Sequence, residues 1–473
     1  MERYDAIVIG GGPGGYECAI RISQNGKRVA LIEEDLLGGT CLNRGCIPTK
    51  SLLHSADVYG IIKESSVFGI YAEGVSFDYG AMVERKNIVI KQLRKGIEFL
   101  QKDYGVDVIK ARAVLSGVHE VTLDNAKKLE ADNIVVATGS SPATFNIPGV
   151  DIPGVVDSTG ILEMTSCPKS IVIIGGGIIG IEFATFFSRL GVKVSIIEMV
   201  DMILGSLDED VSKFISAELG KHGVKIFTGA KVESIEKSPE SKLCVNFSTI
   251  KNGEKNRAEG DVVLIAGGRT PRSKGIGLEK AGVLVDRRGY IQVDGLCRTN
   301  VPGVFAIGDC NGKMLLAHVA SAQGLMVADY IGGKSVRQLD MNRIPSCVYC
   351  RPEVSMVGLT EAQAHSTGRE IKTCVFSLSG NGRAMTMGEN TGFIKLIYDK
   401  ETEEILGCHI VGPNATDLVA EVVAVMESEG TITELGRAVH PHPTVSEVVM
   451  EVAHVCHGNC VHVPKAKIIP KRE

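Results

Sequence analysis

Two cysteines stand five positions apart in the segment GGTCLNRGCIPTK, at Cys41 and Cys46. In a regular helix this spacing separates the Cα atoms by roughly 8.6 Å, from a rise of ~7.5 Å and a rotation of ~140°. A disulfide needs a Cα separation below about 7 Å. The pair is therefore either two free thiols or a redox-active disulfide across an irregular turn, which Gly45 and Pro48 permit and which eases reduction of the bond.

Lys50 follows the second cysteine, and the cysteine pair lies just before a predicted helical run that includes residues 51–58. A helix N-terminus and a nearby cation both favour the thiolate over the thiol, and here they would act on Cys46. Taken alone, Lys50 is also consistent with an ordinary surface lysine.

Two stretches, residues 6–34 and 171–199, share one pattern of a β-branched strand, a Gly-rich turn, a helix and a second strand. This pattern predicts a dinucleotide-binding βαβ unit, in which glycines permit a tight turn, close approach to a pyrophosphate and tight helix packing. The helix N-terminus then faces the phosphates. The glycines concerned are Gly10, Gly12 and Gly15 in the first stretch, and Gly175, Gly177 and Gly180 in the second.

An acidic residue ends the second strand of each unit, Glu33 in the first and Glu198 in the second. Such a carboxylate accepts hydrogen bonds from ribose hydroxyls, although an exposed strand end is the simpler alternative for either residue alone. Because the acidic residue stands at the same distance from the Gly-rich turn in both stretches, the pattern favours two nucleotide sites. No arginine lies near Glu198, which favours NAD over NADP because a carboxylate repels the 2′-phosphate. Proximity to the first site favours the redox interpretation of the cysteines.

Composition excludes several other classes of protein. The chain has 473 residues and a formal net charge of −5, with no basic stripe of the kind that a nucleic-acid binder needs. No uninterrupted apolar run reaches the ~18 residues of a membrane span. The N-terminus has no signal or transit pattern, so we expect a cytoplasmic protein. Thirteen cysteines spread along the chain do not indicate a structural disulfide framework, and no metal site is predicted.

Seven motifs together carry a resemblance to a known family. They are GGGPGGY at 10–16, TCLNRGCIPTK at 40–50, IVVATGSSP at 134–142, GGGIIGIE at 175–182, GGRTPR at 267–272, VFAIGDC at 304–310 and HPHPTVSE at 440–447. In this set and order the chain resembles the flavin-dependent pyridine nucleotide-disulfide oxidoreductases. The resemblance implies bound FAD and NAD.

The resemblance also implies an α/β architecture of two Rossmann-like nucleotide-binding domains and a C-terminal α+β dimerisation domain. Pro- and Gly-rich stretches at 146–155 and 331–335 suggest boundaries between these parts. The expected division is an FAD-binding domain over residues 1–147, an NAD-binding domain over 148–272, a central return to the FAD domain over 273–341, and a dimerisation domain over 342–473.

Roles for individual residues follow from the same resemblance. Cys41 is expected to meet the substrate dithiol and Cys46 to contact the flavin, with Lys50 and Glu182 near the flavin where the nicotinamide docks. His442 would be the base and Glu447 the carboxylate that holds it, serving the cysteines of a second subunit in a homodimer. Further cofactor contacts are expected from Thr138, Gly139, Gly268 and Asp309.

His442 and Glu447 also have simpler interpretations. Thr444 and Glu447 fit a capping box at a helix start, while His440 or His442 would then be turn residues. A thiol attacks only as its thiolate, so some group must remove the proton. The resemblance favours that role for His442, and Glu447 can serve as both cap and partner.

Within the family, the chain is most similar to the members that oxidise dihydrolipoamide on carrier proteins and reduce NAD. Partners would be lipoyl-bearing proteins of 2-oxo acid dehydrogenase or glycine cleavage systems. Related disulfide reductases and mercuric reductase are alternatives. Cys456 and Cys460 could share a helix face with His454 or His457 as metal ligands, although small buried residues are the simpler and favoured interpretation. Less favoured is a non-catalytic flavoprotein scaffold.

Overall fold

The computed structural model describes residues 2–238 and 242–464. Its chain divides into two compact units. The first contains residues 1–146, 156–167 and 267–339, and the second contains residues 147–155, 168–266 and 340–473. Each unit is therefore assembled from segments that are distant in the sequence.

The first unit is built on a mixed sheet with helices packed against it. Its helices are α1 (Pro13–Gln24), α2 (Gly39–Arg44), α3 (Cys46–Glu64), α4 (Tyr79–Asp103), α5 (Gly160–Glu163) and α8 (Ala317–Ile331), with 3₁₀ turns at Ser65–Phe68 and Gly308–Asn311. Its strands are β1 (Glu2–Ile9), β2 (Val29–Glu33), β3 (Asp107–Lys110), β4 (Ala113–Leu115), β5 (Glu120–Leu123), β6 (Lys128–Val136), β7 (Ser140–Pro142), β16 (Arg269–Pro271) and β17 (Val304–Ala306).

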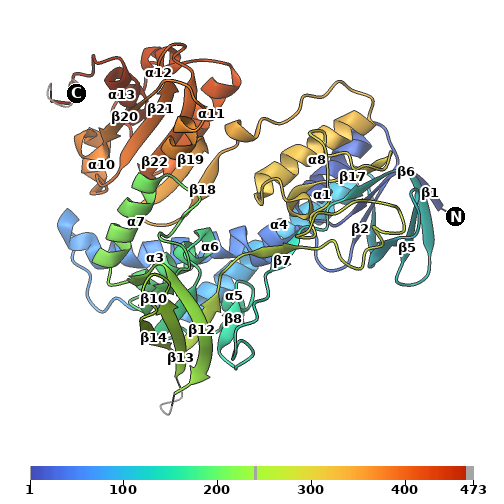
Figure 1. Cartoon of the computed structure of the whole chain (residues 1–473), viewed down its shortest axis with the longest axis horizontal. Coiled ribbons are helices and arrows are strands. Elements are labelled where there is room, and N and C mark those ends of the chain that lie inside the picture. The colour runs from blue at the N-terminus through green and yellow to red at the C-terminus, as the bar shows by residue number, and fades with distance from the viewer. Residues whose placement is uncertain (1, 239–241, 465–473) are drawn as a thin grey trace. The chain divides into compact units, whose positions relative to one another are not determined.

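Parallel strands in the order β3-β2-β1-β6, with β17 on β6, form the centre of this unit. Ile7 of β1 stands opposite Ala30 of β2 and Ile134 of β6, and all three are buried, as expected for a parallel sheet covered on both faces. Helices α1 and α8 lie side by side (Figure 1). A Cβ on Gly324 would lie 2.4 Å from the carbonyl oxygen of Gly14, so only glycine allows this approach.

The second unit combines a second parallel sheet with two antiparallel sheets. Its helices are α6 (Ile178–Arg189), α7 (Glu209–Lys221), α9 (Glu361–His365), α10 (Gly382–Met387), α11 (Ala415–Glu427), α12 (Ile432–Arg437) and α13 (Glu447–Cys456). Its strands are β9 (Ser170–Ile174), β10 (Lys193–Ile197), β11 (Lys225–Phe227), β12 (Ala230–Lys237), β13 (Leu243–Thr249), β14 (Lys255–Gly260), β15 (Val262–Ile265), β18 (Ser346–Val348), β19 (Glu353–Gly358), β20 (Ile371–Ser377), β21 (Phe393–Asp399) and β22 (Ile405–Gly412), while β8 is Val155–Asp157.

The strand order β11-β10-β9-β15 is parallel throughout and repeats the arrangement around β1. The C-terminal sheet, in the order β18-β19-β22-β21-β20, is antiparallel. Helices α11 and α13 pack on it over a core that includes Leu396, Ile410, Val419 and Val452. Two Rossmann-like βαβ arrangements and a C-terminal α+β part confirm the predicted fold class.

Gly180 closes the second Gly-rich turn against its strand. A Cβ there would lie 2.0 Å from the carbonyl oxygen of Gly175. Gly180→Ala should therefore lower the free energy of unfolding by roughly 1–3 kcal/mol, since backbone must move to relieve the clash. Gly220→Ala is the matched control, because a Cβ on that helical glycine meets nothing within 4 Å and alanine favours the helix. Chemical denaturation of both variants checks this, and equal stabilities would contradict it.

A buried lysine links two parts of the second unit. Lys395 of β21 is 2% exposed, and its Nζ lies 2.8 Å from Oδ1 of Asp208, 2.7 Å from Oδ2 of Asp210 and 2.6 Å from Oε2 of Glu361. Asp208 also accepts the backbone N–H of Glu361 at 3.0 Å. Hydrogen bonds to these carboxylates raise the pKa of Lys395 although burial opposes this, so the ammonium stays charged.

Lys395→Met should destabilise the protein by about 3–5 kcal/mol, because it leaves the buried Asp208 carboxylate without its cation. Lys213→Met is the control, since that lysine pairs with Glu209 at the surface, where an ion pair contributes little. Denaturant titration of the two variants gives the comparison. A loss at Lys395 no larger than at Lys213 would show that the cluster has no stabilising role.

Candidate active site

Cys41 and Cys46, in the first unit, lie on either side of a break between helices. Helix α2 ends at Arg44, Gly45 has non-helical angles of φ −145° and ψ −106°, and α3 begins at Cys46. A Cβ on Gly45 would lie 3.0 Å from the carbonyl oxygen of Thr40. The irregular turn that a Cys41–Cys46 disulfide would need is thus present at Gly45.

Cys41 and Cys46 interact directly, and the structure records both as free thiols. The hydrogen bond with Cys46 and then burial raise the pKa of Cys41, while the positive charge of Lys50 acts in the opposite direction. Cys41 therefore keeps its proton at neutral pH while it lies beside Cys46.

Both Gly-rich turns have the same three-part geometry. The first glycines, Gly10 and Gly175, have φ values of +106° and +112°, which L side chains rarely adopt. A Cβ on Gly15 would lie 1.9 Å from the carbonyl oxygen of Gly10, which is the same close packing as at Gly180.

The middle glycine of each turn lies in open space. A Cβ on Gly12 would have only the Cα of Gly39 within 4 Å, at 3.9 Å, and a Cβ on Gly177 would have nothing. Each of these glycines precedes the first turn of a helix, α1 or α6. Open space beside a helix N-terminus fits an incoming pyrophosphate, so both turns fit a dinucleotide.

The two acidic strand ends make matching contacts. Glu33 accepts a hydrogen bond from the backbone N–H of Gly11 at 2.6 Å, and Glu198 accepts one from Gly176 at 2.5 Å. The second oxygen of each carboxylate accepts the N–H two residues later, at Asp35 and Val200. The backbone therefore fixes each carboxylate beside its Gly-rich turn, a contact that the sequence pattern did not predict.

Asp309 is held by two residues that sequence reasoning missed. It lies in the 3₁₀ turn at Gly308–Asn311 and accepts a hydrogen bond from the hydroxyl of Ser140. Nε of Arg269 donates to Ser140 Oγ at 2.7 Å and lies 3.7 Å from Oδ2 of Asp309. Both residues lie inside motifs noted in the sequence, and that position was the available signal that they belong to the site.

Thr138 and Gly139 connect the same region to the end of β16. The hydroxyl of Thr138 donates to the carbonyl of Arg272 at 2.6 Å, and the carbonyl of Gly139 accepts the Arg272 N–H at 2.9 Å. Gly268, with φ +141°, accepts the N–H of Ala143 at 3.0 Å. The structure thus places Thr138, Gly139 and Gly268 along one connected stretch of the first unit.

Lys50 and Glu182 are placed in different units. Lys50 lies one helical turn after Cys46 on α3 of the first unit, whereas Glu182 lies on α6 of the second. Glu182 is 4% exposed and accepts the backbone N–H of Tyr349 at 3.1 Å. The pairing of Lys50 with Glu182 stays a prediction.

His442 and Glu447 form a pair at the start of α13. Nδ1 of His442 lies 2.9 Å from Oε1 of Glu447, and 79% of the histidine side chain is exposed. A hydrogen on Nδ1 donates to the carboxylate, which leaves Nε2 available to a substrate. The capping box that was an alternative role for Thr444 and Glu447 is absent at this helix. The Thr444 hydroxyl donates to the Pro441 carbonyl, and only the Thr444 N–H donates to Glu447, at 2.9 Å.

Residues 4–324 match the family model described as pyridine nucleotide-disulphide oxidoreductase. The chain belongs to this family. Residues 344–453 match the dimerisation domain of the pyridine nucleotide-disulphide oxidoreductases. Together the two matches confirm the resemblance drawn from the motifs, and they make the chain an oxidoreductase.

Curated relatives in this oxidoreductase family are named dihydrolipoyl dehydrogenase. The chain is 40% identical to the one from Chlamydia muridarum, covering 98% of this chain and 99% of the relative. It is 37% identical to the Bacillus subtilis protein, at 97% and 99% coverage, and 40% identical to that of Thermus scotoductus, at 98% and 99%. The similarity therefore spans the whole length.

Solved structures show the same fold. A Cu(II) complex of the HOCl-induced flavoprotein disulfide reductase RclA from Escherichia coli matches with a TM-score of 0.86 and 30% identity, covering 96% of this chain and 100% of that one. LpdA from Mycobacterium tuberculosis matches with a TM-score of 0.87 and 25% identity, covering 96% and 99%.

Glu447 has a pKa that is held below its ordinary value in this oxidoreductase. Partial burial acts to raise it, but hydrogen bonds from the Thr444 N–H and from His442 outweigh that effect. A lowered pKa means that the ionised carboxylate stabilises the fold above its ordinary pKa of about 4.3, and that this contribution is lost as pH falls through the lowered value.

Glu447→Gln should therefore be less stable than the wild type at neutral pH, with a difference that shrinks toward pH 3 or so. Free energies of unfolding measured across this range check the prediction. Glu401→Gln, at an exposed glutamate, is the control. A difference between wild type and Glu447→Gln that does not change with pH would contradict it.

The C-terminal cysteines do not form the shared helix face that their spacing allowed. Helix α13 ends at Cys456, and Gly458 has φ +70°, so Cys456 and Cys460 do not share a helix face. Cys460 instead donates to Oε2 of Glu451 at 3.0 Å, and His454 bonds the carbonyl of Gly436 at 2.9 Å. Within residues 2–238 and 242–464, no three His, Cys, Asp or Glu side chains are grouped to hold a metal ion.

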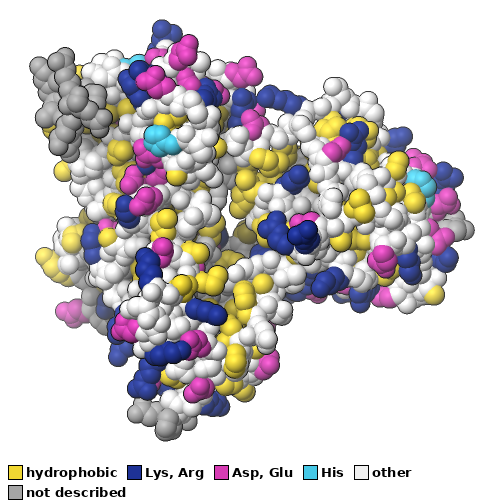
Figure 2. Space-filling model, viewed as in Figure 1, with side chains coloured by type: hydrophobic (Ala, Val, Ile, Leu, Met, Phe, Trp, Pro, Cys, Tyr) yellow, Lys and Arg dark blue, Asp and Glu magenta, His cyan; other side chains and the backbone are white. Residues whose placement is uncertain are grey.

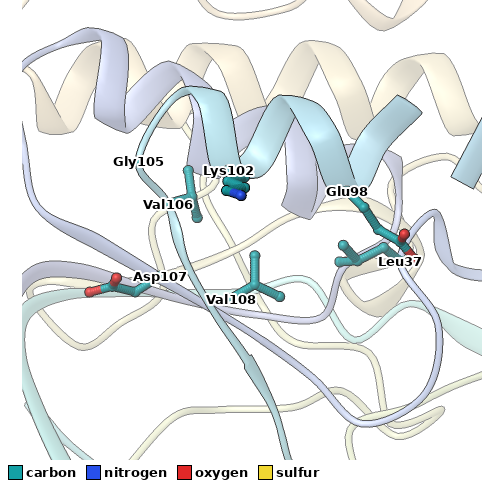
Figure 3. A pocket seen from close by; sticks show the side chains of 7 residues that line it. All are labelled: Leu37, Glu98, Lys102, Gly105, Val106, Asp107 and Val108. Carbon is teal, nitrogen blue, oxygen red and sulfur yellow. The ribbon is translucent and has the colours of Figure 1, made fainter. Parts of the chain in front are cut away.

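A pocket of about 380 Å³ lies in the first unit (Figure 3). The side chains around it come from the end of α4, from β3 and from the β2–α2 loop; they are Leu37, Glu98, Lys102, Val106, Asp107 and Val108, with Gly105 between the two elements. Its lining includes none of the predicted site residues. It therefore gives no support to any catalytic role.

Two surface properties bear on partners. Basic and acidic side chains are interspersed on the face seen in Figure 2, without one broad basic field. In the described part of the chain, no helix is both long and apolar enough to cross a bilayer.

Proposed function

We propose that this oxidoreductase is a homodimeric dihydrolipoyl dehydrogenase, which oxidises a dihydrolipoyl group on a carrier protein and reduces NAD. The observation that carries the proposal is the similarity, at about 40% identity over almost the full length, to several curated dihydrolipoyl dehydrogenases. Full-length similarity matters because the same scaffold also serves reductases of other disulfides.

FAD would bind the first unit and NAD the second. The proposed FAD contacts are Gly10, Gly12, Gly15, Glu33, Lys50, Thr138, Gly139, Gly268 and Asp309. The proposed NAD contacts are Gly175, Gly177, Gly180, Glu182 and Glu198. Support comes from the open space at Gly12 and Gly177 and from the carboxylates fixed beside each turn. Glu198 favours NAD over NADP because it repels a 2′-phosphate.

The thiol chemistry begins with the oxidised Cys41–Cys46 disulfide. Nε2 of His442, contributed by the other subunit, takes the proton of one substrate thiol, and Glu447 stabilises the imidazolium that forms. The substrate thiolate attacks Sγ of Cys41, so the disulfide breaks and Cys46 leaves as a thiolate. The second substrate thiol then displaces Cys41 from the first, which closes the lipoyl disulfide and returns Cys41 as a thiol.

Two electrons now reside on the cysteine pair. When bound, FAD supplies their transfer from the thiols to NAD⁺ as a hydride equivalent. The chain's own part is to keep Cys46 ionised and Cys41 protonated, in agreement with the raised pKa of Cys41. Lipoyl-bearing proteins of 2-oxo acid dehydrogenase or glycine cleavage systems would be its partners.

The test is NADH formation from dihydrolipoamide and NAD⁺ by the purified FAD-loaded homodimer. Parallel assays offer NADP⁺ in place of NAD⁺, and NADPH with glutathione disulfide or with mercuric ion. Brisk NADH formation supports the proposal. Failure of that reaction together with NADPH-linked reduction of either alternative substrate would replace it with a related reductase.

A further inference from the structure

A second pair of cysteines, used by no step above, lies in the C-terminal part of the second unit. Cys374 is on the edge strand β20, and Cys456 is the last residue of α13. Both are half-buried and pack against the core beneath the C-terminal sheet. Distant segments of the chain thus bring two thiols to one place.

The strand register shows why they meet. Cys374 stands opposite Leu396 of β21, and Lys372 stands opposite Tyr398, so Cys374 and Tyr398 are diagonal neighbours on one face. Helix α13 packs against both strands. The hydroxyl of Tyr398 donates to the carbonyl oxygen of Cys456 at 3.2 Å, which fixes the end of the helix beside Cys374.

The surroundings distinguish the two sulfurs. The hydrogen bond with Cys456 lowers the pKa of Cys374; burial acts against this, while the Tyr398 hydroxyl and the charge of Lys372 add to it. The same interaction with Cys374, followed by burial, raises the pKa of Cys456. Thiolate therefore forms at Cys374, while Cys456 stays protonated beside it.

We propose that Cys374 and Cys456 are a second redox pair, in which hydroperoxides oxidise Cys374 and Cys456 resolves the product to a disulfide. The Cys374 thiolate attacks the terminal oxygen of the hydroperoxide, the O–O bond breaks, and sulfenic acid forms while hydroxide leaves from hydrogen peroxide, or an alkoxide from an organic hydroperoxide. The sulfur of Cys456 then attacks the sulfenic sulfur. The S–S bond forms, the S–O bond breaks, and water leaves with the Cys456 proton, so two electrons pass to one hydroperoxide.

Neighbouring cysteines are poorly suited to the same reaction. Cys408 is fully buried, and burial raises its pKa. Burial and then the hydrogen bond to Glu451 raise the pKa of Cys460 to about 11. Oxidation should therefore select Cys374 before Cys408 or Cys460.

The test begins with the reduced FAD-loaded homodimer exposed to hydrogen peroxide. Free thiols are alkylated and the protein is digested with trypsin without reductant. Mass spectrometry should find the peptide of residues 373–383, whose one cysteine is Cys374, joined to the peptide of residues 438–465. The join should persist in Cys460→Ser and vanish in Cys374→Ser and Cys456→Ser. Dihydrolipoamide turnover in all three variants should match the wild type, since none touches the proposed site.

A second measurement identifies the attacking sulfur. In Cys456→Ser, dimedone should trap sulfenic acid at Cys374 at a level about tenfold or more above Cys460. Trapping at Cys456 in Cys374→Ser would reverse the assigned roles and overturn the proposal. So would peroxide-treated protein in which the Cys41–Cys46 disulfide forms but the 373–383 peptide stays unlinked, or is linked through Cys460.

Discussion

Replacing His442 by glutamine should reduce dihydrolipoamide oxidation by ~10²–10⁴-fold, the usual contribution of a positioned general base. Glutamine keeps much of the side-chain volume but cannot take up the thiol proton. The side chain is 79% exposed and bonds only Glu447 in the described part of the chain, so its loss should leave the fold intact. Steady-state rates with dihydrolipoamide and NAD⁺ give the comparison.

The control for His442→Gln is a reaction that does not need the base. NADH oxidation by an artificial acceptor such as ferricyanide bypasses the dithiol, so it should keep its wild-type rate. His365→Gln, at an exposed histidine at the end of α9, should leave both reactions unchanged. Equal losses of the two reactions in His442→Gln would indicate a structural histidine and remove the base from the mechanism.

Cys46→Ser should abolish dithiol turnover, with a loss of at least ~10³-fold, because a serine can neither form nor reopen the disulfide. FAD should still bind, since the Gly-rich turn and Asp309 are untouched. The two-electron-reduced variant should lack the long-wavelength absorption that arises when a thiolate contacts the flavin. Anaerobic reduction followed by visible spectroscopy measures this directly.

Two further variants distinguish the thiol that meets the substrate from the thiol that contacts the flavin. Cys41→Ser should lose turnover to a similar degree but keep the long-wavelength absorption, because Cys46 remains. Cys167→Ser, at another half-buried cysteine of the first unit, should keep both activity and absorption. Absorption that survives in Cys46→Ser and is lost in Cys41→Ser would exchange the roles of the two sulfurs.

The sequence predicted the local elements around the site well, because their signals lie within short segments. Each βαβ unit shows its strand, its turn and its helix within about 30 residues. Helix geometry showed that a Cys41–Cys46 disulfide would need a break in the helix, and Gly45 provides one. Such predictions depend only on the conformations that residues close in sequence can adopt.

Contacts between distant segments escaped prediction. Ser140, Arg269 and Asp309 come from three separate motifs, and only the folded chain shows that they bond one another. Nothing in the pattern around Lys395 indicated that a lysine would be buried on a strand, because its partners precede it in the sequence by many residues. Pairing of this kind is set by strand register and helix packing rather than by local spacing.

The segment around Cys456 and Cys460 shows a different limit of prediction from sequence. A helix continuing through Cys460 was compatible with the cysteine spacing, but the structure ends α13 at Cys456 and turns the chain at Gly458. A glycine with positive φ is a common helix terminator, so that residue was the signal against the helical interpretation. The end of the helix then directs Cys456 toward β20 rather than toward Cys460.

The Lys395 cluster has a consequence for how the second unit unfolds. Asp208 precedes helix α7 beside the parallel sheet, while Lys395 and Glu361 belong to the antiparallel part. If only one of the two parts unfolded, the other would keep a buried charge without its partner, and an unpaired charge in a low-dielectric interior is costly in free energy. The ion cluster therefore couples the stability of the parallel sheet to that of the antiparallel part, so we expect the two to unfold together.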